Sequence, residues 1–189
     1  MWALVESGSI SKVYNKPVQL KIEDIQYPSN IHSLWSATEL KAIGVYEIVQ
    51  DDTNYKDPQY YTNTDQTFTF ASNQVKATYG TATAKPLNDT TTDGVVTRGL
   101  KYIHCETIDN AAYGLLQPND WMVVRNAESS KAIPSDWLDY RVAVRTAATD
   151  MKTKINAVSD VDALAALYVY NDATPPVRPL GEWPTEPTS

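Results

Sequence analysis

The hydrophobic period of this 189-residue chain changes near its middle, and that change limits the folds it can adopt. Before residue 80, apolar and polar residues alternate in short runs, which is the period of half-buried strands. After residue 98, apolar residues recur every three or four positions, which is the period of amphipathic helices. Residues 81–94 between them hold almost no large apolar side chain, a composition typical of a linker.

These patterns predict an α+β fold with two folded parts. The first is a small, mainly β N-terminal domain with one short helix, and the second is a C-terminal α-helical module. The predicted divisions are a β domain over 1–80, a linker over 81–97, a helical module over 98–168 and a proline-rich segment over 169–189.

The strands and the helix of the first domain follow from local signals. Ser36 and Glu39 have the spacing of a capping box, in which each residue hydrogen-bonds to the backbone of the other, so a helix of about two turns should begin there. Gly44 is placed to end it in the left-handed conformation. Alternation and turn residues predict strands over 2–5, 10–14, 18–22, 45–50, 60–62, 67–70 and 75–79, the first two as a hairpin.

The second domain carries two long amphipathic stripes and one short one. Residues 117–120 should break the first helix, residues 121–124 should pack in the interior, and Pro134 should lie in the first turn of the second helix. Ser159 and Asp160 offer a cap for a third, short helix. The predicted stripes are Leu100, His104, Ile108, Ala111 and Leu115, then Trp137, Tyr140, Val144, Ala148, Met151 and Ile155, then Leu164 and Leu167.

Composition argues against several kinds of partner and compartment. With 42% hydrophobic residues, a chain of this length can bury a core without a metal ion or a disulfide, and it has a single cysteine. The net charge of −7 would repel nucleic acid and anionic membranes, so neither is expected as a partner. The chain has no run of about 20 apolar residues and no basic secretion signal at its start, which favours synthesis and residence in the cytosol.

The sequence shows no catalytic signature, so we expect no enzyme activity, cofactor or metal site. His104 and Cys105 are neighbours, but adjacent side chains in a helix point about 100° apart and cannot act on each other. His104 should instead belong to the apolar stripe, with Cys105 as a small buried side chain. Residues 88–94 resemble the start of a calcium loop, but Leu100 stands where the bidentate carboxylate would be needed.

The aromatic residues are mostly amphipathic, with 12 Tyr and 5 Trp against 2 Phe. Such rings are enriched at protein interfaces, because the ring can be buried while its polar atom keeps a hydrogen bond. The same residues could equally fill a small core and edge strands. The proline-rich end, with five prolines over residues 171–187, could either lie along a groove with Trp183 as its anchor or remain disordered.

The C-terminal half also contains an ordered set of aromatic, arginine and proline positions. An Asp-Trp pair is followed by an arginine, then by a helix with the pattern Trp-x-x-Tyr-Arg-x-x-x-Arg, and finally by Trp-Pro-x-x-Pro. The positions concerned are 119–125, Glu128, Ile133, Pro134, Trp137, Tyr140, Arg141, Val144, Arg145 and 182–187. Over 100–187 this arrangement resembles the tail assembly chaperones and tail-fibre-associated proteins of tailed bacteriophages. Residues 27–31 and 36–45 resemble uncharacterised tail proteins of marine or cyanophage-like viruses.

The resemblance implies a non-catalytic protein that binds other phage tail or tail-fibre proteins during assembly or attachment, in the host cytoplasm and then in the virion tail if it stays there. A permanent structural adaptor of the tail or baseplate, a small phage hydrolase and a homo-oligomer remain alternatives. Arg141 and Arg145 share one helix face, where they could clamp Trp121 internally or dock a partner. The predicted partner-binding residues are Trp137, Tyr140, Arg141, Arg145, Trp183, Pro184 and Pro187.

Overall fold

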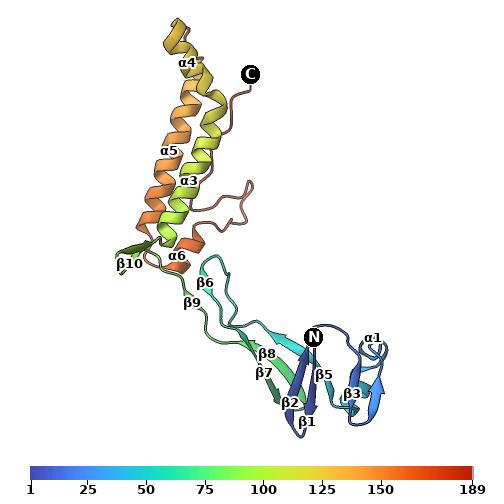
Figure 1. Cartoon of the computed structure of the whole chain (residues 1–189). Helices are drawn as coiled ribbons and strands as arrows, with labels where there is room; N and C mark the ends of the chain where they lie inside the picture. Colours follow the sequence, from blue (N-terminus) through green and yellow to red (C-terminus); the bar gives the residue numbers. More distant parts are fainter. Residues whose placement is uncertain (189) are drawn as a thin grey trace. The chain divides into compact units, whose positions relative to one another are not determined.

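The computed structural model describes residues 1–188 and divides the chain into two compact units, Met1–Thr83 and Ala84–Ser189 (Figure 1). The predicted α+β class is confirmed, because a β-rich region with short helices precedes a helical region. The prediction of a single short helix in the first part was incomplete. Two are present, α1 (Ile31–Leu34) and α2 (Ala37–Ala42).

The first unit is built on a five-stranded sheet in the order β2-β1-β5-β8-β7. Its neighbours are antiparallel except for β5 and β8, which run parallel, and the edge strands β2 and β7 also contact each other. The strand predicted over 18–22 lies outside this sheet. The bounds are β1 Trp2–Glu6, β2 Ser9–Tyr14, β5 Val45–Asp51, β7 Gln66–Ala71 and β8 Gln74–Tyr79, with separate pairs β3 (Leu20–Ile22) with β4 (Ile25–Tyr27) and β6 (Tyr61–Thr62) with β9 (Thr83–Ala84).

Each face of this sheet carries its own apolar cluster. On β1 the successive residues Ala3 and Leu4 belong to different clusters, as the alternation of a strand requires. One cluster joins Ala3 to side chains of β5 and β8 and is bordered by Phe68 and Phe70. The other joins Leu4 to Leu20, Ile31 and Leu40, so the β3–β4 pair and the short helices cover part of this face. Val49 of β5 and Lys76 of β8, farther along the same face, are exposed.

The predicted start and end of α2 are confirmed. The Ser36 hydroxyl accepts the backbone N–H of Glu39 at 3.3 Å, and the Ser36 N–H donates to the Glu39 carboxylate at 2.7 Å. Gly44 follows with φ +79°, and a Cβ there would lie 2.7 Å from the backbone oxygen of Val5. The Val5 N–H donates to the Gly44 oxygen at 2.8 Å, so the turn is fastened directly to β1.

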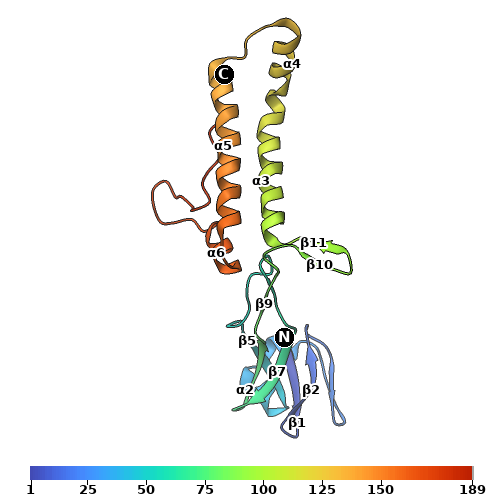
Figure 2. The same ribbon diagram turned by 90° about the vertical axis from the view of Figure 1, so that its left-hand side faces the viewer.

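The second unit is dominated by an antiparallel helical hairpin of α3 (Leu100–Leu116) and α5 (Ser135–Ala157), visible in Figure 2. The predicted stripes are largely confirmed, with Leu100, His104 and Ile108 buried on α3, although Ala112 is buried in place of Ala111. The break at 117–120 is one 3-10 turn, η1 (Gln117–Asn119), after which α4 (Asp120–Ser129) begins. A short α6 (Val161–Ala166) is capped by Asp160, as predicted. Within residues 1–188, none of the helices has the length and apolar character needed to span a membrane.

The stretch expected to be a linker has ordered structure of its own. Besides β9, it contains a hairpin of β10 (Thr90–Thr92) and β11 (Val95–Thr97), turned by Asp93 and Gly94 with φ +51° and +79°. The residues before this hairpin dock on the first turn of α3, where the Leu100 N–H donates to the Pro86 oxygen at 2.9 Å and the Gly99 N–H donates to the Asp89 carboxylate at 2.8 Å.

Candidate protein-binding surface

A buried arginine binds the chain at the junction between α3 and α4. The Arg141 side chain of α5 is 7% exposed, and its Nη1 donates to the Leu116 oxygen at 3.0 Å. Its Nη2 donates to the Asp120 carboxylate at 2.7 Å. The last carbonyl groups of a helix have no partner within that helix, so Arg141 satisfies the end of α3 and fixes the start of α4 with one guanidinium.

The sequence allowed Arg141 and Arg145 of α5 to be either an internal clamp on Trp121 or a docking face, and the structure separates the two residues. Arg141 is an internal clamp, but it holds Leu116 and Asp120 and does not hold Trp121. Arg145 is exposed, and its Nη1 donates to the backbone oxygen of Arg141 at 3.2 Å. Arg141 therefore positions α4, whereas Arg145 faces solvent.

Helix α4 buries none of its ten residues. The expectation that residues 121–124 pack in the interior is therefore wrong. Trp121 is 53% exposed and Val124 is 54% exposed, with Val123 exposed between them. Apolar side chains that face solvent along one short helix are the kind of patch that marks a binding surface.

The exposed tryptophan carries an arginine on its ring. The Arg125 guanidinium carbon lies 4.7 Å from the centroid of the Trp121 ring, which is the geometry of a cation–π contact. The Nε of Arg125 is buried and has no hydrogen-bond partner among the residues that the structure describes. Within residues 1–188, no carboxylate forms an ion pair with this guanidinium.

Two of the predicted aromatic site residues lie at the start of α5 and are used within the unit. Trp137 is half-buried and packs edge-on against Tyr140, with ring centroids 5.9 Å apart and planes at 90°. Tyr140 is 5% exposed. Burial raises the pKa of its hydroxyl, and the nearby charge of Glu186 raises it further. Tyr140 is therefore a buried residue of the unit's interior.

The C-terminal segment is attached to α5 by its middle part. Leu180 is 1% exposed, its N–H donates to the Leu167 oxygen at 2.9 Å, and Lys154 Nζ donates to the Pro179 oxygen at 2.8 Å and the Leu180 oxygen at 3.1 Å. Beyond this anchor the predicted site residues Trp183, Pro184 and Pro187 are each half-buried. The anchor lies at Leu180, and not at Trp183 as the sequence suggested.

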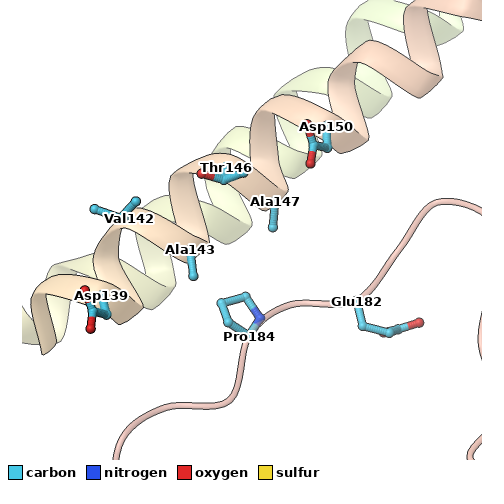
Figure 3. A pocket seen from close by; sticks show the side chains of 8 residues that line it. All are labelled: Asp139, Val142, Ala143, Thr146, Ala147, Asp150, Glu182 and Pro184. Carbon is cyan, nitrogen blue, oxygen red and sulfur yellow. The ribbon is translucent and has the colours of Figure 1, made fainter. Parts of the chain in front are cut away.

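A groove of about 430 Å³ separates the end of this segment from α5, and Figure 3 shows Pro184 opposite the helix near Ala143. Its floor contains the small residues Ala143 and Ala147. Three carboxylates border it, of which Glu182 is paired with Arg178 at 3.2 Å. The full lining is Asp139, Val142, Ala143, Thr146, Ala147, Asp150, Glu182 and Pro184.

His104 and Cys105 play separate structural parts. His104 Nδ1 lies 2.6 Å from the Tyr168 hydroxyl, which fastens α3 to the chain after α6, and burial lowers the pKa of the imidazole. Cys105 is half-buried, so the expectation of a buried side chain was wrong, and desolvation is the main cause that raises the pKa of its thiol. The residues of 1–188 contain no group of three or more His, Cys, Asp or Glu arranged to hold a metal ion.

Sequence reasoning missed the role of Arg125. The signal was present, because Trp121 and Arg125 are four residues apart and such residues face each other on a helix. It also missed Lys154, whose contacts with the C-terminal segment depend on tertiary structure alone. No family model, curated protein or solved structure matches this chain.

Proposed function

We propose that this chain is a non-catalytic tail protein of a tailed bacteriophage that binds other tail or tail-fibre proteins during assembly or attachment. The sequence resemblance suggests this class of partner. The observation that carries the binding role is α4, a helix that buries no residue of its own and exposes Trp121, Val123 and Val124.

Helix α4 has little reason to form on its own. An isolated helix of ten residues is marginal in water, and most helical stability in proteins comes from packing an apolar face. Here the buried guanidinium of Arg141 supplies the attachment through Asp120. The buried charge of Arg141 thus holds in place a helix whose apolar side chains face solvent. Such an arrangement is suited to binding a second protein.

The residues predicted to bind partners divide into two groups under this proposal. Tyr140 and Arg141 are buried and position the surface. Arg145 is exposed, while Trp137, Trp183, Pro184 and Pro187 are half-buried and can contribute at the edge. Tryptophan and arginine are the residue types that most often dominate interface energetics, so Trp121 and Arg125 form the expected centre.

The test is co-purification of the full chain with tail and tail-fibre proteins encoded by the same phage genome. Replacing both Trp121 and Val124 by alanine should weaken the complex by about tenfold or more, since central aromatic residues of interfaces often contribute about 2 kcal/mol. Tyr102→Ala is the matched control, because Tyr102 is 41% exposed in the first turn of α3, at the opposite end of that helix from α4.

Two results would oppose the proposal. One is a complex that forms equally well with the double variant, and the other is a chain that binds none of these proteins. Mass spectrometry of purified particles then separates an assembly factor, which is absent from them, from a permanent adaptor, which is present.

A further inference from the structure

Three arginines of the second unit are positioned on aromatic rings, and their ion pairs differ. Arg98 lies 4.1 Å from the Tyr102 ring centroid and pairs with Asp89 at 2.5 Å. Arg178 lies 5.4 Å from the ring centroid of Tyr170 and pairs with Glu182 at 3.2 Å. In both places the chain supplies an aromatic ring, a guanidinium and a carboxylate.

The third arginine–ring stack, Arg125 on Trp121, has no carboxylate paired with it among residues 1–188. Arg125 rests on Trp121 at 4.7 Å, yet no acidic side chain of residues 1–188 pairs with it. Asp120, at the start of the same helix, is already held by Arg141. Glu128 is three residues away from Arg125 and makes no ion pair with it. Among residues 1–188 the stack therefore has no acidic partner, and it lies on the surface proposed above to bind a partner.

We propose that a carboxylate of the partner completes this stack. The partner would present an Asp or Glu side chain to Arg125 and an adjacent apolar side chain to Trp121 and Val124. This inference rests on the proposed function and adds the chemistry of the partner: an acidic residue flanked by apolar ones.

The geometry favours a carboxylate over a neutral group. Nε is covered within the chain, which leaves the two Nη groups as the fork that an Asp or Glu carboxylate matches with two parallel hydrogen bonds. The Trp121 ring already restricts the guanidinium, so little conformational freedom remains to be lost on binding. Packing of an apolar neighbour on Val124 would exclude water and strengthen the ion pair.

The experiment is an NMR titration of the full ¹⁵N-labelled chain with the capped tripeptide acetyl-Leu-Glu-Leu-amide. The Trp121 indole N–H and the Arg125 Nε–H should both shift in a saturable manner. The same peptide with Gln in place of Glu should shift them at least several-fold less. Arg125→Gln should remove the response of the indole to the Glu peptide, whereas Arg98→Gln should leave it unchanged, because Arg98 already has its carboxylate.

Equal shifts with the Glu and Gln peptides, no shift with either, or a response that survives Arg125→Gln would each overturn the inference. The tail-protein complex separates this failure from that of the proposed function. If the complex forms and is weakened by Trp121→Ala but is insensitive to Arg125→Gln, α4 is the binding surface and its partner does not supply a carboxylate. If the complex requires Trp121 and also loses about tenfold or more in affinity with Arg125→Gln, both proposals hold.

Discussion

The two units of this protein are stabilised in different ways. The N-terminal unit has an apolar cluster on each face of its sheet, with Ala3 in one and Leu4 in the other. The C-terminal hairpin of α3 and α5 has one apolar seam, and three long cationic side chains add to it by binding backbone oxygens. These contacts are Lys101 with Asn156, Arg141 with Leu116, and Lys154 with Pro179 and Leu180.

Two of these oxygens belong to the last turns of α3 and α5, where helix carbonyls lack internal partners. Cations are also favoured there by the helix dipole. The comparison suggests that a two-helix hairpin with a single apolar seam gains further stability when lysine and arginine side chains bind the carbonyl oxygens at the helix ends. It also predicts that substitutions in the first unit act through packing and backbone geometry, and those in the second through charge.

The largest expected effect is in the first unit. Gly44→Ala should destabilise it by about 2–4 kcal/mol, because the residue adopts a left-handed conformation and its new Cβ would meet the Val5 oxygen. Gly8→Ala is the matched control, since Gly8 also has positive φ but a Cβ added there would lie in open space. Chemical denaturation should show a clearly larger loss for Gly44→Ala. Equal losses would mean that the contact with β1 contributes nothing.

In the second unit, Arg141→Met should lower the free energy of unfolding by about 2 kcal/mol. It removes two hydrogen bonds made by a buried charge, while the remaining Asp120 is half-exposed and stays hydrated. Arg145→Met, at an exposed position one turn away, should change stability by less than about 0.5 kcal/mol. Circular dichroism at the helix band would measure both. If Arg141→Met left the free energy of unfolding unchanged, packing alone would hold the hairpin.

A smaller effect is expected at the C-terminal segment. Lys154→Met should cost about 1 kcal/mol by removing the hydrogen bonds to Pro179 and Leu180, and cleavage by chymotrypsin after the buried Leu180 should become faster. Lys152→Met is the control, because Lys152 pairs with the exposed Asp109 on the surface, where ion pairs contribute little. If both variants are cleaved at the wild-type rate, Lys154 does not hold the segment in place.

The smallest effect concerns pH. Burial keeps the folded-state pKa of His104 below its ordinary value of 6.5, so the unfolded chain binds the proton first. Stability should therefore decline as pH falls from about 6.5 towards the lower folded-state pKa, and should not change through this group above about 7. In His104→Gln this part of the decline should disappear from melting temperatures measured across the range. Tyr168→Phe keeps the imidazole and should retain the decline; an unchanged slope in His104→Gln would contradict the assignment.

The sequence predicted those elements whose signals are local. The capping box of Ser36 and Glu39 and the alternation of β7 and β8 depend on neighbouring residues only, so helix and strands appear where expected. The three-residue strand β4 was missed, because it is too short for its period to show. The hairpin of β10 and β11 was taken as part of a linker, because its residues are all exposed and three of them are threonines in a row.

The candidate surface was predicted only in part, for a reason that lies in tertiary structure. An apolar run such as residues 121–124 reads as interior in any sequence, since the pattern does not reveal whether another element will cover it. Here nothing in residues 1–188 does so for Trp121 and Val124. For Arg141 the sequence allowed either an internal clamp or a docking residue. The fold buries it, because its partner oxygens come from residues 116 and 120.

The parallel pairing of β5 with β8 has a consequence for synthesis on the ribosome. Strand β5 is complete at Asp51, but its neighbour β8 ends only at Tyr79, and residues 52–73 must be made in between. During that interval one edge of β5 has unpaired backbone groups, which are a template for pairing with other nascent chains. Crowded polysomes would therefore favour misassembly of the first unit before residue 79 emerges, and slower initiation should raise the yield of correctly folded protein.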